Sequence, residues 1–321
     1  MAFYIASYWV DGLPVPQREA LPEGIVATDS RGLDDLLQSP KDISLGAAVL
    51  LLVPFVLGAM LLIGYIMLRA CNVRVFPRCR FREAPWHAWH LGRCVVVFLV
   101  LQRLVMAGVG WLEASAWSQE ALASVPRVAV LAAAANVLMA GTCLFVVALV
   151  SNEQGGALTL LGLRENRVFS RVALGVTGLM MTFPLLLLAA FIMLVVGPVI
   201  GIEPRPQQLL FSARTIGPLA FVVLGISAVV VAPITEEILF RGFLYSTMRR
   251  YLGPLGAITL TALGFSLLHN YAFGALSLFV IGFLLGYLYE RTGSLVASIA
   301  AHAANNLYSL LVVFVVFHSG G

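Results

Sequence analysis

The sequence predicts an all-α protein built as a polytopic bundle of about eight transmembrane helices. Of its 321 residues, 60% are hydrophobic and only 11% are charged, and the mean hydropathy is +0.94, far from the values of soluble domains. The apolar residues also form runs long enough to cross the hydrocarbon core, which takes about 20 helical residues. Outside a barrel, only a helix satisfies its backbone hydrogen bonds in lipid.

The apolar runs divide the chain into three parts. An acidic N-terminal tail occupies 1–42, transmembrane helices with an arginine-rich cytoplasmic loop occupy 43–171, and a core occupies 172–317. The functional core is expected in the C-terminal four spans. In order, the predicted spans lie near 43–68, 94–112, 128–150, 172–200, 216–248, 255–270, 274–289 and 294–317.

Basic residues are distributed unequally between the two sides of these spans. Twelve fall on one side, six on the other, and two, Arg103 and Arg241, inside spans. By the positive-inside rule the twelve face the cytoplasm, so both termini are expected to be non-cytoplasmic. The twelve are Arg69, Arg74, Arg78, Arg80, Arg82, Arg93, Arg164, Arg167, Arg171, Arg249, Arg250 and Arg291.

Three other patterns favour packing or anchoring. Gly282 and Gly286 form a GxxxG pair on the seventh run, which favours close packing inside the bundle over a dimer face. His87 and His90 in "WHAWH" could be a metal pair, but interfacial tryptophans beside a basic loop are the more ordinary explanation. The cysteines lack the spacing of a zinc ribbon or a disulfide framework; they are Cys71, Cys79, Cys94 and Cys143.

Three charged residues interrupt the fifth run, in the stretch APITEEILFRGF. Glu236, Glu237 and Arg241 would together cost roughly 8–10 kcal/mol if they faced lipid without partners, so they are expected to face the bundle interior or a wet cavity. Glu237 and Arg241 are four residues apart, share one helix face and can form an ion pair. Glu236 lies about 100° round the helix from Glu237 and faces away from that pair.

Two later spans supply imidazole and amide groups. His269 ends the sixth span, and His302 and Asn306 lie four apart on one face of the eighth. Glu236 and His269 are equally far along the chain from a turn predicted near residue 252, so in a hairpin of straight helices they lie at about the same depth. The polar groups can therefore converge at one level of the membrane.

The combined set points to hydrolysis. A carboxylate beside a neutral imidazole can deprotonate a water molecule, and an amide and a second imidazole can donate to the oxyanion that forms. Zinc is an open alternative, because Glu236, His269 and His302 could hold Zn²⁺ with water as its fourth ligand. An ion or proton transporter is a further alternative, but the acids cluster at one level and no inverted repeat is evident.

The motifs Glu236-Glu237-x-x-x-Arg241, Phe265-x-x-x-His269 and His302-x-x-x-Asn306 follow one another on successive spans. In this order they resemble the CPBP intramembrane protease family, which includes type II CAAX prenyl endopeptidases and bacteriocin-processing or Abi-like immunity homologues. The resemblance covers roughly residues 215–315 and implies a protease core within 172–317. It implies that Glu236 and His269 activate the catalytic water, that His302 and Asn306 stabilise the oxyanion, and that Glu237 and Arg241 support the site.

The expected function is an intramembrane endopeptidase, of glutamate type or a metalloprotease, that cleaves a membrane-associated protein or peptide in the manner of CAAX processing. The expected cofactor is none or Zn²⁺. The expected partners are that substrate and the lipid bilayer, with no nucleic acid, in a bacterial plasma membrane. The alternative is a non-catalytic scaffold or bacteriocin-immunity-type protein that uses the same polar cluster to bind a partner.

Overall fold

The computed structural model describes residues 45–73, 87–114, 138, 140–143, 145, 161–163, 166–203 and 218–318. Every regular element in these ranges is helical, which confirms the predicted all-α class for this part of the chain. The acidic tail at 1–42, the loop residues 74–86 and most of the span expected at 128–150 lie outside the described residues.

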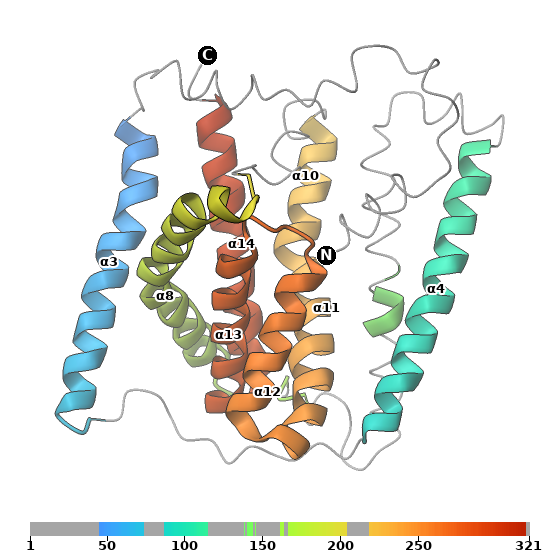
Figure 1. Ribbon diagram of the computed structural model, residues 1–321, viewed down its shortest axis with the longest axis horizontal. Coiled ribbons are helices and arrows are strands. Elements are labelled where there is room, and N and C mark those ends of the chain that lie inside the picture. Colours follow the sequence, from blue (N-terminus) through green and yellow to red (C-terminus); the bar gives the residue numbers. More distant parts are fainter. Residues whose placement is uncertain are drawn as a thin grey trace.

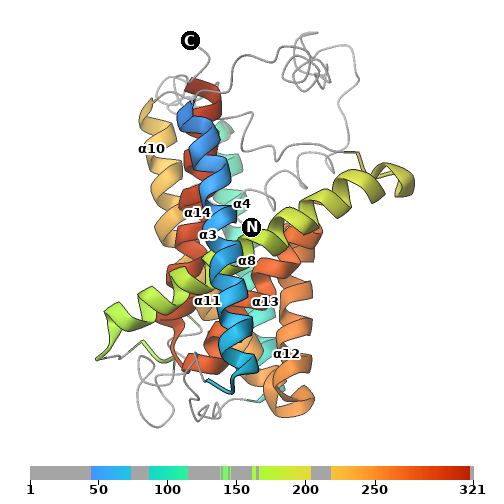
Figure 2. The ribbon, with the colours of Figure 1, turned by 90° about the vertical axis from the view of Figure 1, so that its left-hand side faces the viewer.

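The long helices form a bundle with one oblique member (Figure 1). The helices α3 (Leu45–Ala70), α4 (Ala88–Ala114), α13 (Ala275–Thr292) and α14 (Leu295–His318) run in roughly similar directions. By contrast, α8 (Val168–Val196) crosses the bundle at a steep tilt, as Figure 2 shows from the side. It packs against α3, α13 and α14, so it ties the N-terminal part of the bundle to the C-terminal helices.

Five runs among the described residues are long and apolar enough to cross a membrane. They support an integral membrane protein and agree with the positions predicted from the apolar pattern. The predicted total of eight spans stays a prediction. The five runs are Leu52–Ala70, Val168–Val196, Leu224–Leu268, Ala275–Thr292 and Leu295–Val312.

The third of these runs is a helical hairpin rather than one long helix. It begins within α10 (Pro218–Ile226) and continues through η2 (Ser227–Val231), α11 (Ala232–Glu237), η3 (Ile238–Tyr245) and α12 (Ser246–Leu268). Inside α12, Gly253 has φ 69° and ψ 177°, which is not helical, and Pro254 follows it. Glycine adopts this backbone conformation without a Cβ clash, so the chain reverses there, and the turn predicted near residue 252 is confirmed.

The descending arm of the hairpin alternates between two helical geometries. The segments η2 and η3 are π-helices, in which the backbone bonds run from residue i to i+5, and the six-residue α11 lies between them. Such wide turns are rare and occur often at functional sites, because they shift carbonyl groups out of the regular α pattern. The paired glutamates lie at the end of α11, against the second π-helix.

Small residues let the helices approach one another closely. A Cβ on Gly58 of α3 would collide with the Met180 carbonyl of α8, and a Cβ on Gly175 of α8 would collide with the Ala297 carbonyl of α14. A Cβ on Gly282 of α13 would lie 3.1 Å from the Cα of Ala262 on α12. The GxxxG pair on α13 therefore serves packing inside the bundle, as expected.

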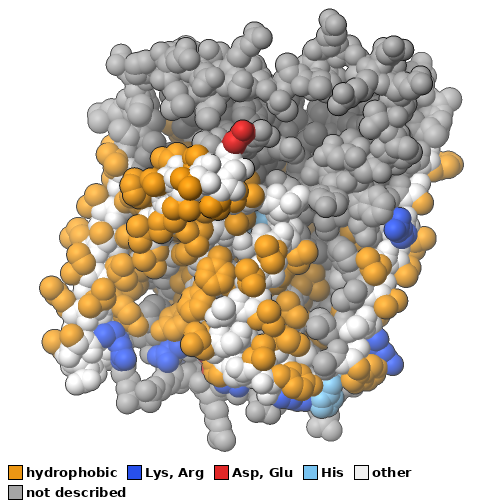
Figure 3. Space-filling model, viewed as in Figure 1, with side chains coloured by type: hydrophobic (Ala, Val, Ile, Leu, Met, Phe, Trp, Pro, Cys, Tyr) orange, Lys and Arg blue, Asp and Glu red, His pale blue; other side chains and the backbone are white. Residues whose placement is uncertain are grey.

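Arginine side chains gather at one end of the bundle, below an apolar surface (Figure 3). Near this end Arg249 donates from Nε and Nη2 to the two carboxylate oxygens of Glu290, at 2.8 and 2.9 Å, and the Tyr245 hydroxyl donates to Glu290 Oε2 at 2.6 Å. These bonds join the hairpin to α13. They lie apart from the Glu237–Arg241 pair in the same arm.

Candidate active site

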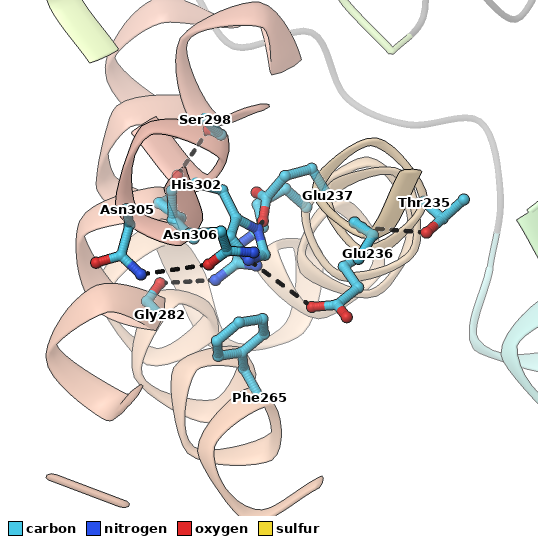
Figure 4. A network of polar contacts seen from close by, with 12 residues as sticks. Thr235, Glu236, Glu237, Phe265, Gly282, Ser298, His302, Asn305 and Asn306 are labelled. Carbon is cyan, nitrogen blue, oxygen red and sulfur yellow. Dashed lines mark hydrogen bonds and ion pairs between the residues drawn. The ribbon is translucent and has the colours of Figure 1, made fainter. Parts of the chain in front are cut away.

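Three elements bring the predicted polar residues together. The descending arm of the hairpin supplies Glu236, Glu237 and Arg241, and α14 supplies His302 and Asn306 (Figure 4). The residue His269 follows the last residue of α12. The side chains of Glu237 and Arg241 are fully buried, with 0% exposure, and Glu236, His269 and His302 are buried at 3 to 8%.

Glu237 is the central acceptor of the cluster. Its Oε1 accepts from Arg241 Nη1 at 2.8 Å, so the predicted ion pair forms, and also from His302 Nδ1 at 3.0 Å. Arg241 extends the chain of contacts by donating from Nη2 to the Gly282 carbonyl of α13 at 2.9 Å. One carboxylate and one guanidinium therefore connect three helices around a buried charge pair.

Both histidines use the same ring nitrogen, Nδ1, for a hydrogen bond within the protein. His302 Nδ1 faces a carboxylate and His269 Nδ1 faces the Phe265 carbonyl at 2.7 Å, and both partners only accept. Each Nδ1 is thus the donor, and each neutral ring keeps an accepting lone pair on Nε2. The His302 Nε2 lies 4.0 Å from Glu236 Oε2, too far for a direct hydrogen bond. Glu236 and His269 are close enough to interact electrostatically.

Aromatic rings form one wall of the cluster. Phe265 contacts His302 edge to face, with ring centroids 5.6 Å apart, and contacts His269 at 4.5 Å. The guanidinium carbon of Arg241 lies 4.9 Å from the same ring centroid. A ring in this position excludes water from the Glu237–Arg241 pair and fixes the orientation of both imidazoles.

Asn306 is directed at the backbone of the hairpin. Its Nδ2 donates to the Ala228 carbonyl in η2 at 2.8 Å, and its Oδ1 lies 3.4 Å from Asn305 Nδ2. The side chain is half-buried. An amide NH₂ carries two donors, so the bond to Ala228 leaves one N–H for another acceptor.

The zinc alternative concerns the side chains of Glu236, His269 and His302. Within the described ranges, no group of three or more His, Cys, Asp or Glu side chains is arranged to hold a metal ion. Zinc at Glu236, His269 and His302 therefore stays a prediction. His87 and His90 are separate from this cluster: Arg250 Nη1 donates to His87 Nδ1 at 2.7 Å, which joins the start of α4 to the hairpin.

Three features of the cluster carried no role in the sequence-based prediction. The Gly282 carbonyl receives Arg241, the Ala228 carbonyl receives Asn306, and the Phe265 ring contacts both histidines. The GxxxG pair signalled close packing at Gly282 but not an acceptor. The sequence does not show which backbone carbonyls accept side-chain bonds, unless a proline stands where the backbone donor should be. Pro233 stands in that position for the Ala228 carbonyl.

Comparison with known proteins agrees with the predicted resemblance over the last third of the chain. Residues 218–308 match the family model described as Type II CAAX prenyl endopeptidase Rce1-like. The matched segment begins with α10, ends within α14 and includes all six predicted site residues. No curated protein and no solved structure matches the chain.

Proposed function

We propose, taking the match of residues 218–308 to the Rce1-like type II CAAX prenyl endopeptidases as the premise, that the chain is an intramembrane endopeptidase. It hydrolyses a peptide bond of a membrane-associated protein or peptide. The observation that carries the proposal is the pair formed by Glu236 Oε2 and His302 Nε2, both buried and 4.0 Å apart. A carboxylate and an accepting imidazole nitrogen at this separation are suited to hold one water molecule.

The geometry supports water activation. A water oxygen about 2.8 Å from each of two atoms 4.0 Å apart makes an angle of about 90° at the oxygen, a usual bridging arrangement. A carboxylate held beside imidazole can take a proton from such a water. The His269 ring, with its Nδ1 bound to the Phe265 carbonyl, keeps its Nε2 available for the same proton.

The proposed reaction has two steps. In the first, Glu236 and His269 accept one proton from the water while its oxygen adds to the peptide carbonyl carbon, and the carbonyl oxygen becomes an oxyanion. In the second, the C–N bond breaks, the leaving amine takes the proton back, and a carboxyl group remains on the other fragment. No serine or cysteine nucleophile is needed.

The oxyanion is met by His302 and Asn306. Because His302 Nδ1 already donates to Glu237, Nε2 of the neutral ring accepts from the water; it donates to an oxyanion only after the ring takes up a proton from bulk water, which it returns once the C–N bond has broken. Asn306 offers the amide N–H that Ala228 does not use. Glu237 and Arg241 hold His302 in place and do not themselves contact the substrate.

The experiment is a cleavage assay on purified protein in detergent. A panel of quenched-fluorescent membrane peptides, one of them prenylated, is incubated with the wild type and with the Glu236→Gln, Glu237→Ala and His269→Ala variants. The expected loss of kcat is about 10²–10⁴-fold for Glu236→Gln and His269→Ala at unchanged melting temperature. Each assay is repeated with a zinc chelator, which is expected to leave the rate unchanged.

A matched control is Glu290→Gln, which neutralises a glutamate that bonds Arg249 at the arginine-rich end. This variant is expected to cleave normally. Cleavage by Glu236→Gln at the wild-type rate would rule out Glu236 as the base, whereas absence of cleavage of every peptide by the wild type would favour the non-catalytic scaffold. Loss of cleavage on chelation, with recovery on adding zinc, would instead favour the metalloprotease alternative.

A further inference from the structure

The Ala228 carbonyl, which accepts a hydrogen bond from Asn306, has no backbone N–H of its own helix to accept from. In η2 the bonds run over five residues, and the Ala232 N–H donates to the Ser227 carbonyl. The next bond of this pattern would join the N–H of residue 233 to the Ala228 carbonyl. That residue is Pro233, which has no N–H to donate. The Asn306 Nδ2, at 2.8 Å, supplies the donor that the helix lacks.

A second side chain binds carbonyls close to Pro233. The Thr235 hydroxyl donates to the Val231 carbonyl at 2.9 Å and lies 3.1 Å from the Ala232 carbonyl. Thr235 and Asn306 thus satisfy carbonyls that all precede Pro233, one from within the turn and the other from α14. The turn that they stabilise ends with Glu236.

The Asn306 bond also sets the position of His302. The two residues are one turn apart on α14, so a bond from Asn306 to η2 fixes the height of His302 relative to α11. The distance that depends on this height is the 4.0 Å between His302 Nε2 and Glu236 Oε2. A small slip of α14 along the hairpin would change it, because no direct bond links these two atoms.

We propose that Asn306 is a positioning residue whose contribution to catalysis passes through the Ala228 carbonyl that Pro233 leaves without a backbone donor. The proposal rests on the proposed function and changes one part of it: the amide acts on the turn that carries Glu236 more than on the oxyanion. A proline in the descending arm and an asparagine on the last helix are therefore a matched pair. Restoring the N–H at position 233 should make the asparagine dispensable.

The experiment is a double-mutant cycle on the full-length chain. The Asn306→Ala variant is expected to lose roughly tenfold or more in kcat, since leaving one half-buried carbonyl unsatisfied disturbs the turn. Pro233→Ala alone is expected to remain close to the wild type. In the Pro233→Ala/Asn306→Ala double variant, the new N–H can bond the Ala228 carbonyl, and most of the lost kcat should return while KM changes little.

Two controls keep the result specific. Pro233→Leu restores the same N–H with a larger side chain and should also rescue Asn306→Ala, which covers the case in which Pro233→Ala alone does not fold. Pro233→Ala should not rescue His302→Ala, because that variant lacks a side chain of the reaction itself. Rescue of Asn306→Ala by either proline substitution supports the proposal.

If neither Pro233→Ala nor Pro233→Leu improves the activity of Asn306→Ala, the proposal is overturned and Asn306 is assigned to the substrate. The melting temperatures of the same variants, measured without substrate, give a second cycle. If the wild type cleaves no peptide, the proposed function fails, yet the melting temperatures still decide the Asn306–Ala228 link. If cleavage occurs and neither cycle shows coupling, the proposed function stands and this inference falls.

Discussion

At the scale of single residues, Glu237 and Arg241 differ from their neighbours in being buried completely and bonded to each other. A buried ion pair contributes little net stability, because removing both charges from water costs about as much as their attraction returns. Substituting only one of the two residues is costly, because the other then remains as a buried charge without a counter-ion. The pair therefore constrains the site more through geometry than through its own net energy.

The complete burial of this ion pair gives a stability prediction. Arg241→Met is expected to destabilise the protein by about 3–5 kcal/mol, because Glu237 then keeps an uncompensated buried charge. The measurement is thermal unfolding in detergent. The Glu237→Gln/Arg241→Met double variant should recover much of the loss, and a double variant as unstable as Arg241→Met alone would contradict the charge argument.

Phe265 gives a prediction about activity. Its ring contacts both imidazoles, and Phe265→Leu keeps an apolar side chain while removing the aromatic face. Aromatic contacts of this kind contribute about 0.5–1.5 kcal/mol beyond their buried area. The expected result is a fall in kcat of up to about tenfold, measured in the peptide assay. A fall in melting temperature with normal kcat would limit the ring to packing.

At the scale of elements, the apolar pattern located the helices but not their internal geometry. Residues 172–200 and 294–317 were predicted as spans, and α8 and α14 occupy them closely. The turn near residue 252 was predicted from the gap between the apolar runs 216–248 and 255–270, and Gly253 is where the chain reverses. Hydrophobic periodicity does not distinguish a π-helix from an α-helix. The sequence pattern therefore did not predict that Glu236 and Glu237 lie between two π-helices.

Residue spacing along a helix explains which contacts of the site could be predicted from the sequence. The pair Glu237 and Arg241 lie four residues apart, and this spacing brings them together in any helix. The bond from His302 to Glu237 depends on how α14 packs against the hairpin, where a Cβ on Gly225 of α10 would lie 3.1 Å from the Leu310 side chain of α14. Spacing along one helix is a local property, whereas contacts between helices require the assembled bundle.

The contact between α12 and α13 gives a prediction at this scale. Gly282→Ala would place a Cβ 3.1 Å from the Ala262 Cα, so α13 must move away and take with it the carbonyl that binds Arg241. The expected loss of stability is about 1–3 kcal/mol, measured by thermal unfolding. Gly264→Ala is the matched control, because a Cβ there meets no atom within 4 Å. Equal effects of the two substitutions would contradict the packing argument.

At the scale of the whole molecule, the arginine-rich end of the bundle is expected to face the cytoplasm. Cys71 is exposed at this end, directly after α3. In a variant whose other cysteines are replaced by alanine, an impermeant maleimide should label Cys71 only after the cells are opened. Val199→Cys, placed beyond the far end of α8 where the side chain is 84% exposed, should be labelled in intact cells. The reverse pattern would invert the topology.

The pairing of Glu237 with Arg241 also has a consequence for how the chain enters the membrane during synthesis. Their helix emerges before α13 and α14, so the Gly282 carbonyl and the His302 ring do not yet exist when it must leave water. Each lone charge at the bilayer centre costs about 2.5–3.5 kcal/mol on insertion scales. A glutamate and an arginine one helical turn apart neutralise each other within a single segment. The segment therefore carries its own counter-ion into the bilayer, keeps this contact in the folded bundle and adds bonds to later helices as they arrive.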